Sequence, residues 1–592
     1  MINAFKSELK HKQFRAFLII LIVIAGIFWV TRTHVLSYDE YRDLYLAKAL
    51  MNGEYSYYGD AYYKHPPLYM IILSVSSRIF GFGEDAGYII SILFGLSTAV
   101  LTYLLVSKFI NKKLAIPSSL ILIFNPWFSK YSRDLRFEIA TMFFMFLTLY
   151  FFYSYTQNKR KRSLVLTGVS LGLGLLTKTF VFLIIPALAI FLLALVYKKS
   201  LTFTGATKSF VSILIIAAIV YSPWMAYTQI NGGPSQFFAQ SEEFSGNVRW
   251  NPDYVSPPAY FYILELPNLL TIPILLLAIA GLLLVNRKSR IFYLIGAWII
   301  FHIAFVSIMG YKETRFIMYL VPVFSIAAAA GANKLLEKFN LRKLLPMYIL
   351  VIVLIIPGIL AAENPIWQEY PTPKNWDLWQ YLQQNVDRNE YVLANDYGMV
   401  ELYSNPSDVV VGDWQFDAGR YLSFDSKYAL LEPKVTYVND PDKKEIFSKV
   451  QEFYYNGPDR KINLTLYKVD TRKLSGLIYG NATIKVSGKL SGIPAGNPIN
   501  KGKIILATGD GQAVNVFYTK PNGEFVLYLP LAGQYLINAK AFGYQEGTVL
   551  MQTDGSQLVI CTSQTNCFQK NSLDLSLQFK SFISHGYADA RF

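Results

Sequence analysis

Side chains suited to chemistry gather in a polar stretch, residues 37–69, that lies between two strongly apolar segments. This stretch is rich in tyrosine, begins with the acidic pair Asp39 and Glu40, and ends with a His-Pro-Pro run at 65–67. Because the preceding apolar segment ends a few residues before Asp39, the Asp39 carboxylate would lie where a membrane helix meets water. Partial desolvation there raises the pKa of a carboxylate and sharpens its basicity, whereas a nearby cation such as Arg42 keeps it charged.

The residues around this acidic pair are expected to form a helix from Asp39 to Met51. In that helix Arg42 lies three residues after Asp39, on the same face. An apolar stripe is formed by Tyr41, Leu44, Tyr45 and Ala49. One apolar and one charged stripe are typical of a helix that lies in the membrane plane. Such a helix would hold Asp39 at the lip of a cavity.

The composition indicates a polytopic α-helical membrane protein with a soluble part. Of the 592 residues, 53% are hydrophobic and 16% are aromatic, which excludes a soluble globular protein. Residues 14–30 are expected to be the first transmembrane helix and not a cleavable signal, because no small-residue cleavage pattern follows them. Apolar runs of about 17–25 residues predict about eleven transmembrane helices, near 14–33, 87–107, 114–126, 137–155, 163–178, 180–197, 208–229, 266–286, 291–309, 314–331 and 345–362.

The distribution of Lys and Arg predicts how these helices are oriented, since both residues favour the cytoplasmic side. With the N-terminus inside, every predicted inner loop is basic, whereas the outer connections carry acids and aromatic residues. Everything after residue 362 is then outside, in a prokaryotic plasma membrane. Residues 68–80 are too short to span comfortably and are expected to form an interfacial or re-entrant helix. If they span, every later orientation inverts.

The net charge of +15 follows largely from those inner loops. They can meet anionic lipid head groups, so nucleic-acid binding is not needed to explain the charge. The two cysteines, Cys561 and Cys567, lie in the part assigned to the outside, where a disulfide can persist. Two free thiols remain the alternative.

The outer part divides in two. Residues 363–470 are predicted to form an α/β domain, with helices at 373–385 and 442–454 and strands at 391–395, 409–414, 435–439 and 462–469. From residue 471 the helical signals stop, and a β-sandwich is expected over 471–592, with strands at 483–488, 503–508, 513–519, 524–529, 534–541 and 548–553.

Charged residues recur on the predicted outer face of the membrane part. Ordinary interfacial snorkelling explains any one of them, but as a set acids and bases occur together where positive charge is otherwise scarce. The set consists of Asp39, Glu40, Arg42, Lys64, His65, Arg133, Asp134, Arg136, Glu138, Lys178, Lys312, Glu313 and Arg315.

Several short motifs resemble those of a known superfamily. They are Asp39-Glu40 in the first outer loop, His-Pro-Pro-Leu at 65–68, Arg133 five residues before Glu138, Gly-Leu-Leu-Thr-Lys at 174–178, and Arg315 with Pro322. In this order they look like the GT-C glycosyltransferases, and within them the branch of protein O-mannosyltransferases and lipid A aminoarabinose transferases. The resemblance covers about residues 14–362. A Pro-Asn-Gly-Glu-Phe turn at 521–525 and the run at 533–544 resemble carboxypeptidase-regulatory-like modules.

The resemblance implies an inverting transfer of a sugar from a polyprenyl-phosphate-linked donor to an acceptor on the outer face. Asp39 would be the general base for the acceptor hydroxyl, and Glu40 or Glu138 would position the acceptor or the sugar. Fixed cations would stabilise the phosphate that leaves. The candidates are Arg42, Lys64, His65, Arg133, Lys178 and Arg315. The acceptor, whether protein, glycan or lipid, stays open, and so does the sugar.

No cofactor is required by this chemistry, and the five histidines show no spacing typical of a metal site. A divalent ion held by Asp39 and Glu138 remains an alternative. His302, inside an apolar helix, is expected to be a hydrogen-bonded packing residue. The loop at 229–266 is long enough to act as a lid. A transporter or flippase of a lipid-linked substrate is the rival function, but it should show internal repeats and ionisable groups near the bilayer midplane, and neither is clear here.

Overall fold

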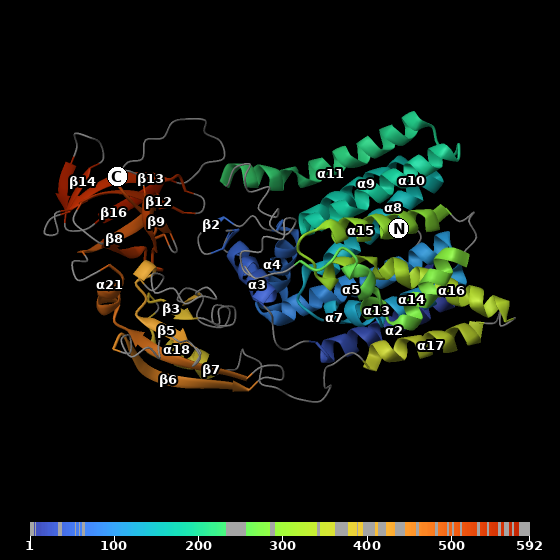
Figure 1. Ribbon diagram of the computed structural model, residues 1–592, viewed down its shortest axis with the longest axis horizontal. Helices are drawn as coiled ribbons and strands as arrows, with labels where there is room; N and C mark the ends of the chain where they lie inside the picture. The colour runs from blue at the N-terminus through green and yellow to red at the C-terminus, as the bar shows by residue number, and fades with distance from the viewer. Residues whose placement is uncertain are drawn as a thin grey trace. The chain divides into compact units, whose positions relative to one another are not determined.

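The structure, a computed structural model, describes residues 5–231, 256–360 and 377–578 apart from short gaps, the longest of which are 33–37, 285–289, 395–408, 412–421, 432–444 and 562–566. Its contacts divide the chain into two compact units: Met1–Thr33 with Tyr63–Trp367, and His34–Tyr62 with Gln368–Phe592. The described part of the first unit is helical, and the described strands all belong to the second (Figure 1).

The described part of the first unit is a bundle of mostly apolar helices. In chain order its elements are α2 (Lys12–Val30), α4 (Leu68–Phe80), α5 (Glu84–Phe109), α6 (Lys112–Ile123), α7 (Pro126–Tyr131), α8 (Phe137–Asn158), α9 (Lys161–Thr177), η1 (Thr179–Ile184), α10 (Ile185–Tyr197), α11 (Phe203–Asn231), α13 (Phe261–Leu270), α14 (Ile272–Leu284), α15 (Arg290–Ile308), η3 (Thr314–Leu320), α16 (Val321–Lys338) and α17 (Leu344–Leu360).

Each of the predicted apolar segments folds as helix, but not all are long enough to count as spans. Seven of the described helices are long and apolar enough to cross a membrane, or up to eight if the bent pair α13 and α14 is one span. The helices α9 and α17 have 17 residues each, and α6 has only 12. The number of clear spans within the described residues is therefore lower than the sequence predicts.

The interruptions between consecutive helices have local causes in the sequence. Helix α6 stops because the Asn125 side chain accepts a hydrogen bond from the Phe128 backbone N–H and starts α7 with Pro126 at its first position. Helices α13 and α14 meet at 108°, with Thr271 between them at a φ of 67°. The predicted spans 180–197 and 314–331 both begin as 3₁₀ turns, η1 and η3. The short helix predicted over residues 68–80 is confirmed as α4.

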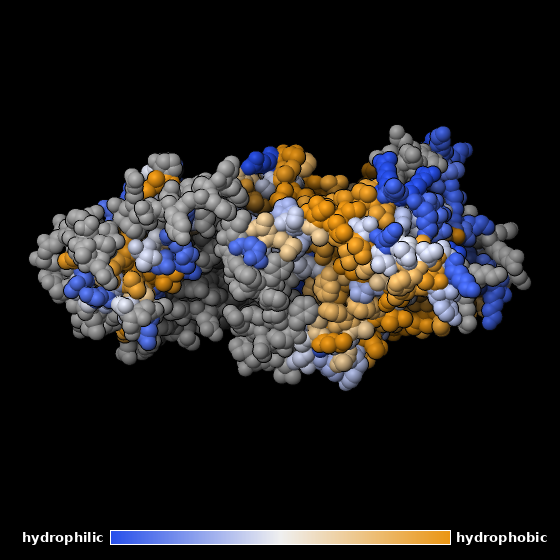
Figure 2. Space-filling view, turned by 90° about the horizontal axis from the view of Figure 1, so that it is seen from above, coloured by the Kyte–Doolittle hydropathy of each residue, from blue (hydrophilic) through white to orange (hydrophobic). Residues whose placement is uncertain are grey.

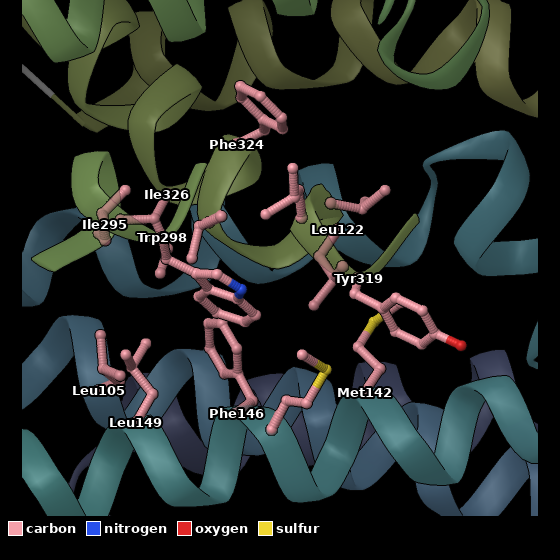
Figure 3. Packing of buried hydrophobic residues seen from close by; sticks show 14 of the residues in the cluster. Leu105, Leu122, Met142, Phe146, Leu149, Ile295, Trp298, Tyr319, Phe324 and Ile326 are labelled. Atoms are coloured by element: carbon pink, nitrogen blue, oxygen red, sulfur yellow. The ribbon is translucent and has the colours of Figure 1, made fainter. Parts of the chain in front are cut away.

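The core of the bundle is aromatic and closely packed. In Figure 3 Trp298 of α15 lies against Phe146 of α8, with ring centroids 6.3 Å apart, and Met142 and Tyr319 continue the same layer. Helices α14 and α16 approach so closely that a Cβ on Gly331 would meet the carbonyl oxygen of Leu277. Figure 2 shows the outside of this unit as an apolar belt that borders hydrophilic residues at one end.

The second unit begins with His34–Tyr62, which contains most of the polar stretch. The predicted helix at 39–51 is confirmed as α3 (Tyr38–Met51), and a two-residue hairpin of β1 (Ser56–Tyr57) and β2 (Asp60–Ala61) follows it. The remainder starts with α18 (Asp377–Asn385) and a mixed sheet ordered β4-β3-β5-β7-β6, made of β3 (Val392–Ala394), β4 (Val409–Val411), β5 (Tyr428–Leu431), β6 (Phe447–Asn456) and β7 (Lys461–Val469).

Two predictions in this part are wrong. Instead of a helix over 442–454, residues 447–456 form β6, because they pair along their length with β7, and this cross-strand pairing outweighs local helix propensity. Instead of a helix-free segment after residue 471, Thr471–Tyr479 is helix α21. The Asp470 carboxylate accepts hydrogen bonds from the backbone of Arg472 and Lys473 and caps it. The predicted strand 435–439 lies outside the described residues.

The last domain is the expected β-sandwich of two sheets. One has the order β10-β9-β12-β13-β14-β15 and the other β11-β8-β16. The strands are β8 (Ile484–Ile493), β9 (Lys503–Thr508), β10 (Ala513–Tyr518), β11 (Glu524–Leu529), β12 (Gly533–Lys540), β13 (Gly547–Thr553), β14 (Leu558–Cys561), β15 (Cys567–Lys570) and β16 (Leu573–Gln578). The antiparallel register of β14 and β15 places Cys561 opposite Cys567.

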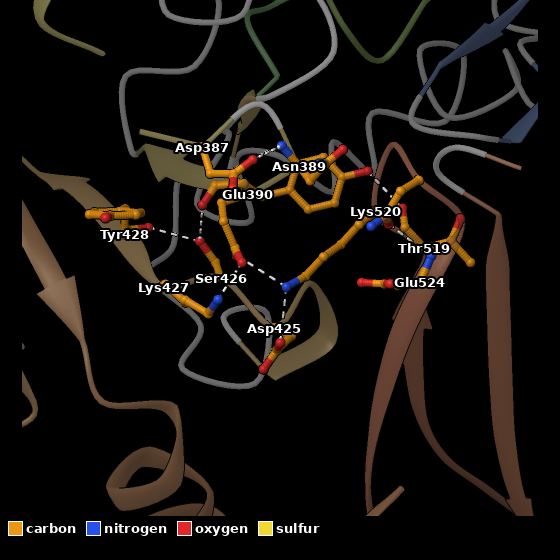
Figure 4. A network of polar contacts seen from close by, with 12 residues as sticks. Asp387, Asn389, Glu390, Asp425, Ser426, Lys427, Tyr428, Thr519, Lys520 and Glu524 are labelled. Atoms are coloured by element: carbon orange, nitrogen blue, oxygen red, sulfur yellow. Dashed lines mark hydrogen bonds and ion pairs between the residues drawn. The ribbon is translucent and has the colours of Figure 1, made fainter. Parts of the chain in front are cut away.

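A buried polar network ties this sandwich to the α/β domain (Figure 4). Lys520 Nζ lies 3.1 Å from both Glu390 Oε2 and Asp425 Oδ2, and the Tyr528 hydroxyl donates to Asp425 Oδ1 at 2.6 Å. The Tyr391 hydroxyl donates to the Thr519 carbonyl oxygen at 2.7 Å. These contacts join the two domains through groups that are largely closed to solvent.

Candidate active site

Two basic side chains from separate parts of the first unit, Lys178 and Arg315, converge on the carboxylate of Glu138. Glu138 is fully buried, its Oε1 lies 3.4 Å from Lys178 Nζ, and Arg315 Nη1 lies 3.9 Å from the same oxygen. The three residues are far apart in sequence, and two of them are basic. A buried carboxylate is stable in its charged form when such cations face it.

The ends of helices place these groups. Glu138 lies in the first turn of α8, where a negative charge complements the helix macrodipole. Lys178 is the extended residue between α9 and η1, with φ −155° and ψ 134°. Arg315 is the second residue of η3, which begins directly after the extended residue Glu313. One cation therefore precedes a 3₁₀ turn and the other lies within one.

Aromatic rings enclose the Lys178 ammonium. Its Nζ lies 4.6 Å from the centroid of the Phe137 ring, 5.1 Å from that of Phe180 and 6.0 Å from that of Phe316. His65 packs against one of these rings, with its ring centroid 4.9 Å from that of Phe137. Cation–π contacts and the ion pair with Glu138 thus hold a charged group that has lost most of its water.

Arg315 is shared between two carboxylates. It forms an ion pair with Glu313, which also accepts a hydrogen bond from the Tyr311 hydroxyl. The segment that carries Arg315 is anchored to α13, because Thr314 Oγ1 donates to Glu265 Oε2 at 2.8 Å. These contacts fix the position of Arg315.

Tyr131 is a residue of this region that sequence reasoning missed. Burial, and then the Glu138 carboxylate, raise the pKa of the Tyr131 hydroxyl, while Arg136 and Arg315 act in the opposite direction. The Arg136 guanidinium lies 5.9 Å from the centroid of its ring. One tyrosine among 42 carries no signal of its own. Its position at the end of α7, a few residues before the Arg133 motif, is the feature that could have indicated it.

Arg133 anchors the segment that leads into α8. Its Nη1 donates to the Thr31 carbonyl oxygen at 3.0 Å and to Thr31 Oγ1 at 2.9 Å, and its Nε donates to the Ser129 carbonyl oxygen at 3.2 Å. Burial lowers the pKa of the guanidinium. Two glycines of α5 let this segment approach, since a Cβ on Gly95 would meet Ser132 Oγ and one on Gly87 would meet the Leu135 side chain.

In the second unit, Asp39 belongs to a local charge cluster on α3. Arg42 Nη1 lies 2.9 Å from Asp39 Oδ1, and Arg42 Nη2 lies 2.9 Å from Oδ1 of the fully buried Asp43. The Asp39 side chain keeps 26% of its surface exposed, whereas Glu40 is buried. The predicted proximity of Arg42 to Asp39 is confirmed, and Asp43 is the partner that the sequence analysis did not single out.

Two of the charged residues singled out in the sequence are not part of the group around Glu138: one lies outside the described residues, and the other has different contacts. Lys64 lies outside the described residues, as does most of the 229–266 loop. Lys312 Nζ donates to the Met309 carbonyl oxygen at 2.6 Å and to Ser256 Oγ at 3.1 Å, and burial lowers its pKa. Within the described part of the chain, no group of three or more His, Cys, Asp or Glu side chains is arranged to hold a metal ion.

Comparisons with known proteins, by sequence and by structure, agree on the kind of protein that this chain resembles. Residues 64–227 match the family described as dolichyl-phosphate-mannose-protein mannosyltransferase. This range contains His65, Arg133, Glu138 and Lys178. No match is found among the curated proteins.

Two solved structures of one protein share the fold. ArnT from Cupriavidus metallidurans, bound to undecaprenyl phosphate, is 15% identical with a TM-score of 0.59, over 76% of this chain and 98% of that chain. ArnT from the same organism in the apo state is 15% identical with a TM-score of 0.57, over 77% and 98%. The chain is thus a multi-pass helical membrane protein with C-terminal β-containing domains, and it resembles the GT-C glycosyltransferases, in the branch of the O-mannosyltransferases and ArnT.

Proposed function

We propose that this protein is an inverting glycosyltransferase that moves a sugar from a polyprenyl-phosphate-linked donor to an acceptor hydroxyl on the outer face of a prokaryotic plasma membrane. The observation that carries the proposal is the convergence of Lys178 and Arg315 on the buried Glu138. The family match over residues 64–227 and the ArnT structure bound to undecaprenyl phosphate support the class of donor.

Lys178 and Arg315 take the role of phosphate ligands. As the bond between the anomeric carbon and the phosphate oxygen breaks, the phosphate keeps the electron pair and gains charge. Cations that are fixed before the reaction stabilise that charge without reorganising. Arg315 offers a planar fork that matches phosphate oxygens, and Lys178 offers a point charge enclosed by aromatic rings.

Glu138 is proposed to position these two cations. Because it is fully buried and faces both, its negative charge fixes their side chains and offsets their repulsion. Without it, two positive charges would face each other in a desolvated site. This role differs from direct contact with the acceptor or sugar.

Asp39 is proposed to be the general base. Its ion pair with Arg42 favours the charged carboxylate, and its partial exposure leaves room for a hydroxyl to approach. The acceptor oxygen attacks the anomeric carbon from the side opposite the phosphate, and its proton passes to Asp39. Glu40, which is buried, would position neighbouring groups. No cofactor enters this scheme.

The test is transfer of radiolabelled sugar from a panel of polyprenyl-phosphate-sugars to membranes that contain the full chain. Wild type is compared with Asp39→Asn and with Asp377→Asn, an exposed acid of α18 that serves as the matched control. Label with wild type and with the control, but not with Asp39→Asn, supports the proposal, and the labelled product identifies the acceptor class. Equal label in all three removes Asp39 from the reaction. No label with any donor argues against a glycosyltransferase.

A further inference from the structure

A buried histidine is hydrogen-bonded to the segment that carries Arg315, and it takes no part in the ion pairs described above. His302 is in the middle of α15 and has no solvent-exposed surface. Its Nε2 lies 2.7 Å from the carbonyl oxygen of Phe316. Its Nδ1 is buried, with no hydrogen-bond partner among the described residues. A buried polar atom left without a partner is costly, so a benefit elsewhere is expected to offset it.

The hydrogen bond requires the proton to be on Nε2, because a carbonyl oxygen can only accept. A charged ring would carry a second proton on the buried Nδ1, which has no acceptor here. His302 is therefore a neutral donor. It joins the middle of one transmembrane helix to the 3₁₀ turn η3, where Arg315 lies.

Phe316 connects this bond to both cations. It follows Arg315 in the chain, so fixing its carbonyl group fixes the backbone from which Arg315 projects. Its ring lies 4.9 Å from the ring of Phe180, and both rings belong to the group that encloses the Lys178 ammonium. One hydrogen bond thus restrains both the backbone next to Arg315 and the aromatic rings that enclose the Lys178 ammonium.

We propose that His302 is a positioning residue for the donor phosphate site, which it serves by holding the Phe316 carbonyl and thereby setting the separation of Arg315 and Lys178. This inference rests on the proposed function, because it assigns the two cations to a phosphate. It adds a residue that contacts no reacting atom and that lies in a helix outside the 64–227 family match.

The side chains of Gln and Asn allow a matched test. Gln at position 302 places an amide N–H near the position of Nε2, whereas Asn places the same group near the position of Nδ1. Both bury one amide, so they differ mainly in whether the Phe316 carbonyl can be reached. Trp298→Phe, one turn earlier in α15 and equally buried, controls for a general disturbance of packing.

The full chain in lipid nanodiscs is measured in two ways: steady-state transfer from a polyprenyl-phosphate-sugar, and hydrogen–deuterium exchange of residues 311–320. For His302→Asn we expect a rise in the donor KM, a fall in kcat/KM on the order of 10- to 100-fold, and faster exchange over 311–320. His302→Gln should stay within about threefold of wild type in both measurements. Trp298→Phe should leave exchange over 311–320 unchanged.

Two results overturn the inference: equal losses in His302→Asn and His302→Gln, or faster exchange in His302→Asn with unchanged kinetics. If His302→Asn does not fold, His302→Gln decides alone, since a loss in that variant contradicts the proposed bond. If wild type transfers no sugar, the proposed function fails. The exchange data then still decide whether His302 holds the 311–320 segment.

Discussion

Lys178 Nζ and Glu138 Oε1 are 3.4 Å apart in a pair whose side chains are almost closed to solvent. Removing one partner of such a pair leaves the other charge buried and uncompensated, which typically costs about 3–5 kcal/mol. Glu138→Gln is therefore expected to lower stability by about that amount and to reduce kcat/KM, because Lys178 and Arg315 lose their common counter-charge. Thermal unfolding and transfer assays on the same preparation measure both.

The matched control is an exposed ion pair. Lys334 Nζ and Glu337 Oε2 are 2.7 Å apart, but both side chains are about two-fifths exposed. Glu337→Gln should change stability by less than about 1 kcal/mol and leave transfer unchanged. Equal effects of the two substitutions would contradict a special role for the buried pair.

Arg133→Gln should separate anchoring from phosphate binding. Arg133 holds Thr31 and the Ser129 carbonyl oxygen. Its loss should lower the melting temperature, because buried carbonyl groups lose donors that cost about 1–3 kcal/mol to leave unpaired. The KM for the donor should change far less than in Lys178→Gln. A large rise in KM without loss of stability would instead place Arg133 on the phosphate.

The crossing of α14 and α16 depends on glycine at position 331. A Cβ there would meet the Leu277 carbonyl oxygen, so the two helices must separate to admit it. Gly331→Ala is expected to destabilise the protein by about 1–3 kcal/mol. Gly296 in α15 has nothing within 4 Å of the position of a Cβ, and Gly296→Ala should be neutral or stabilising by up to about 1 kcal/mol. Thermal unfolding of both variants in one lipid composition checks the contrast.

The network between the two C-terminal domains predicts that their stability depends on alkaline pH. Burial, followed by the Asp425 carboxylate, raises the pKa of the Tyr528 hydroxyl above its ordinary value of about 10. A group whose folded pKa is raised contributes stability that is present below its unfolded pKa and is lost as pH rises through the folded one. The two C-terminal domains should therefore lose stability as pH rises above about 10.

Tyr528→Phe removes the ionising group and should flatten this slope, although the variant is less stable at neutral pH because Asp425 loses a donor. The measurement is the unfolding transition of the two C-terminal domains in the full chain, followed between pH 8 and pH 11. An unchanged slope in Tyr528→Phe would show that another group carries the dependence.

The sequence predicted those features that depend on local pattern. Apolar length located the helices, the alternation of residues located most strands of the sandwich, and the spacing of Asp39 and Arg42 correctly placed them together on α3. It failed where long-range pairing decides. Residues 447–456 form a strand that pairs along its length with β7, and this pairing cannot be read from the local pattern over 442–454. The Asn125 cap at the end of the predicted segment 114–126 is a local signal, but it lies within an otherwise apolar run.

The site shows the same division. Motifs indicated Glu138, Lys178 and Arg315 separately, but only the packing of α8 against the two 3₁₀ turns shows that they share one carboxylate oxygen. Tyr131 and the bond from His302 to Phe316 depend on contacts between segments distant in sequence. Neither feature is indicated by the spacing of residues in the sequence.

The most direct test of the account is the affinity of the full chain in nanodiscs for undecaprenyl phosphate, compared between wild type, Lys178→Gln and Arg315→Gln. Charge-assisted bonds of about 1.5–3 kcal/mol predict a Kd that rises about 10- to 150-fold in each variant. Lys198→Gln, a basic residue at the end of α10 that packs on Tyr293, should bind like wild type. Undiminished binding in Lys178→Gln and Arg315→Gln would contradict the assignment of these cations to the donor phosphate.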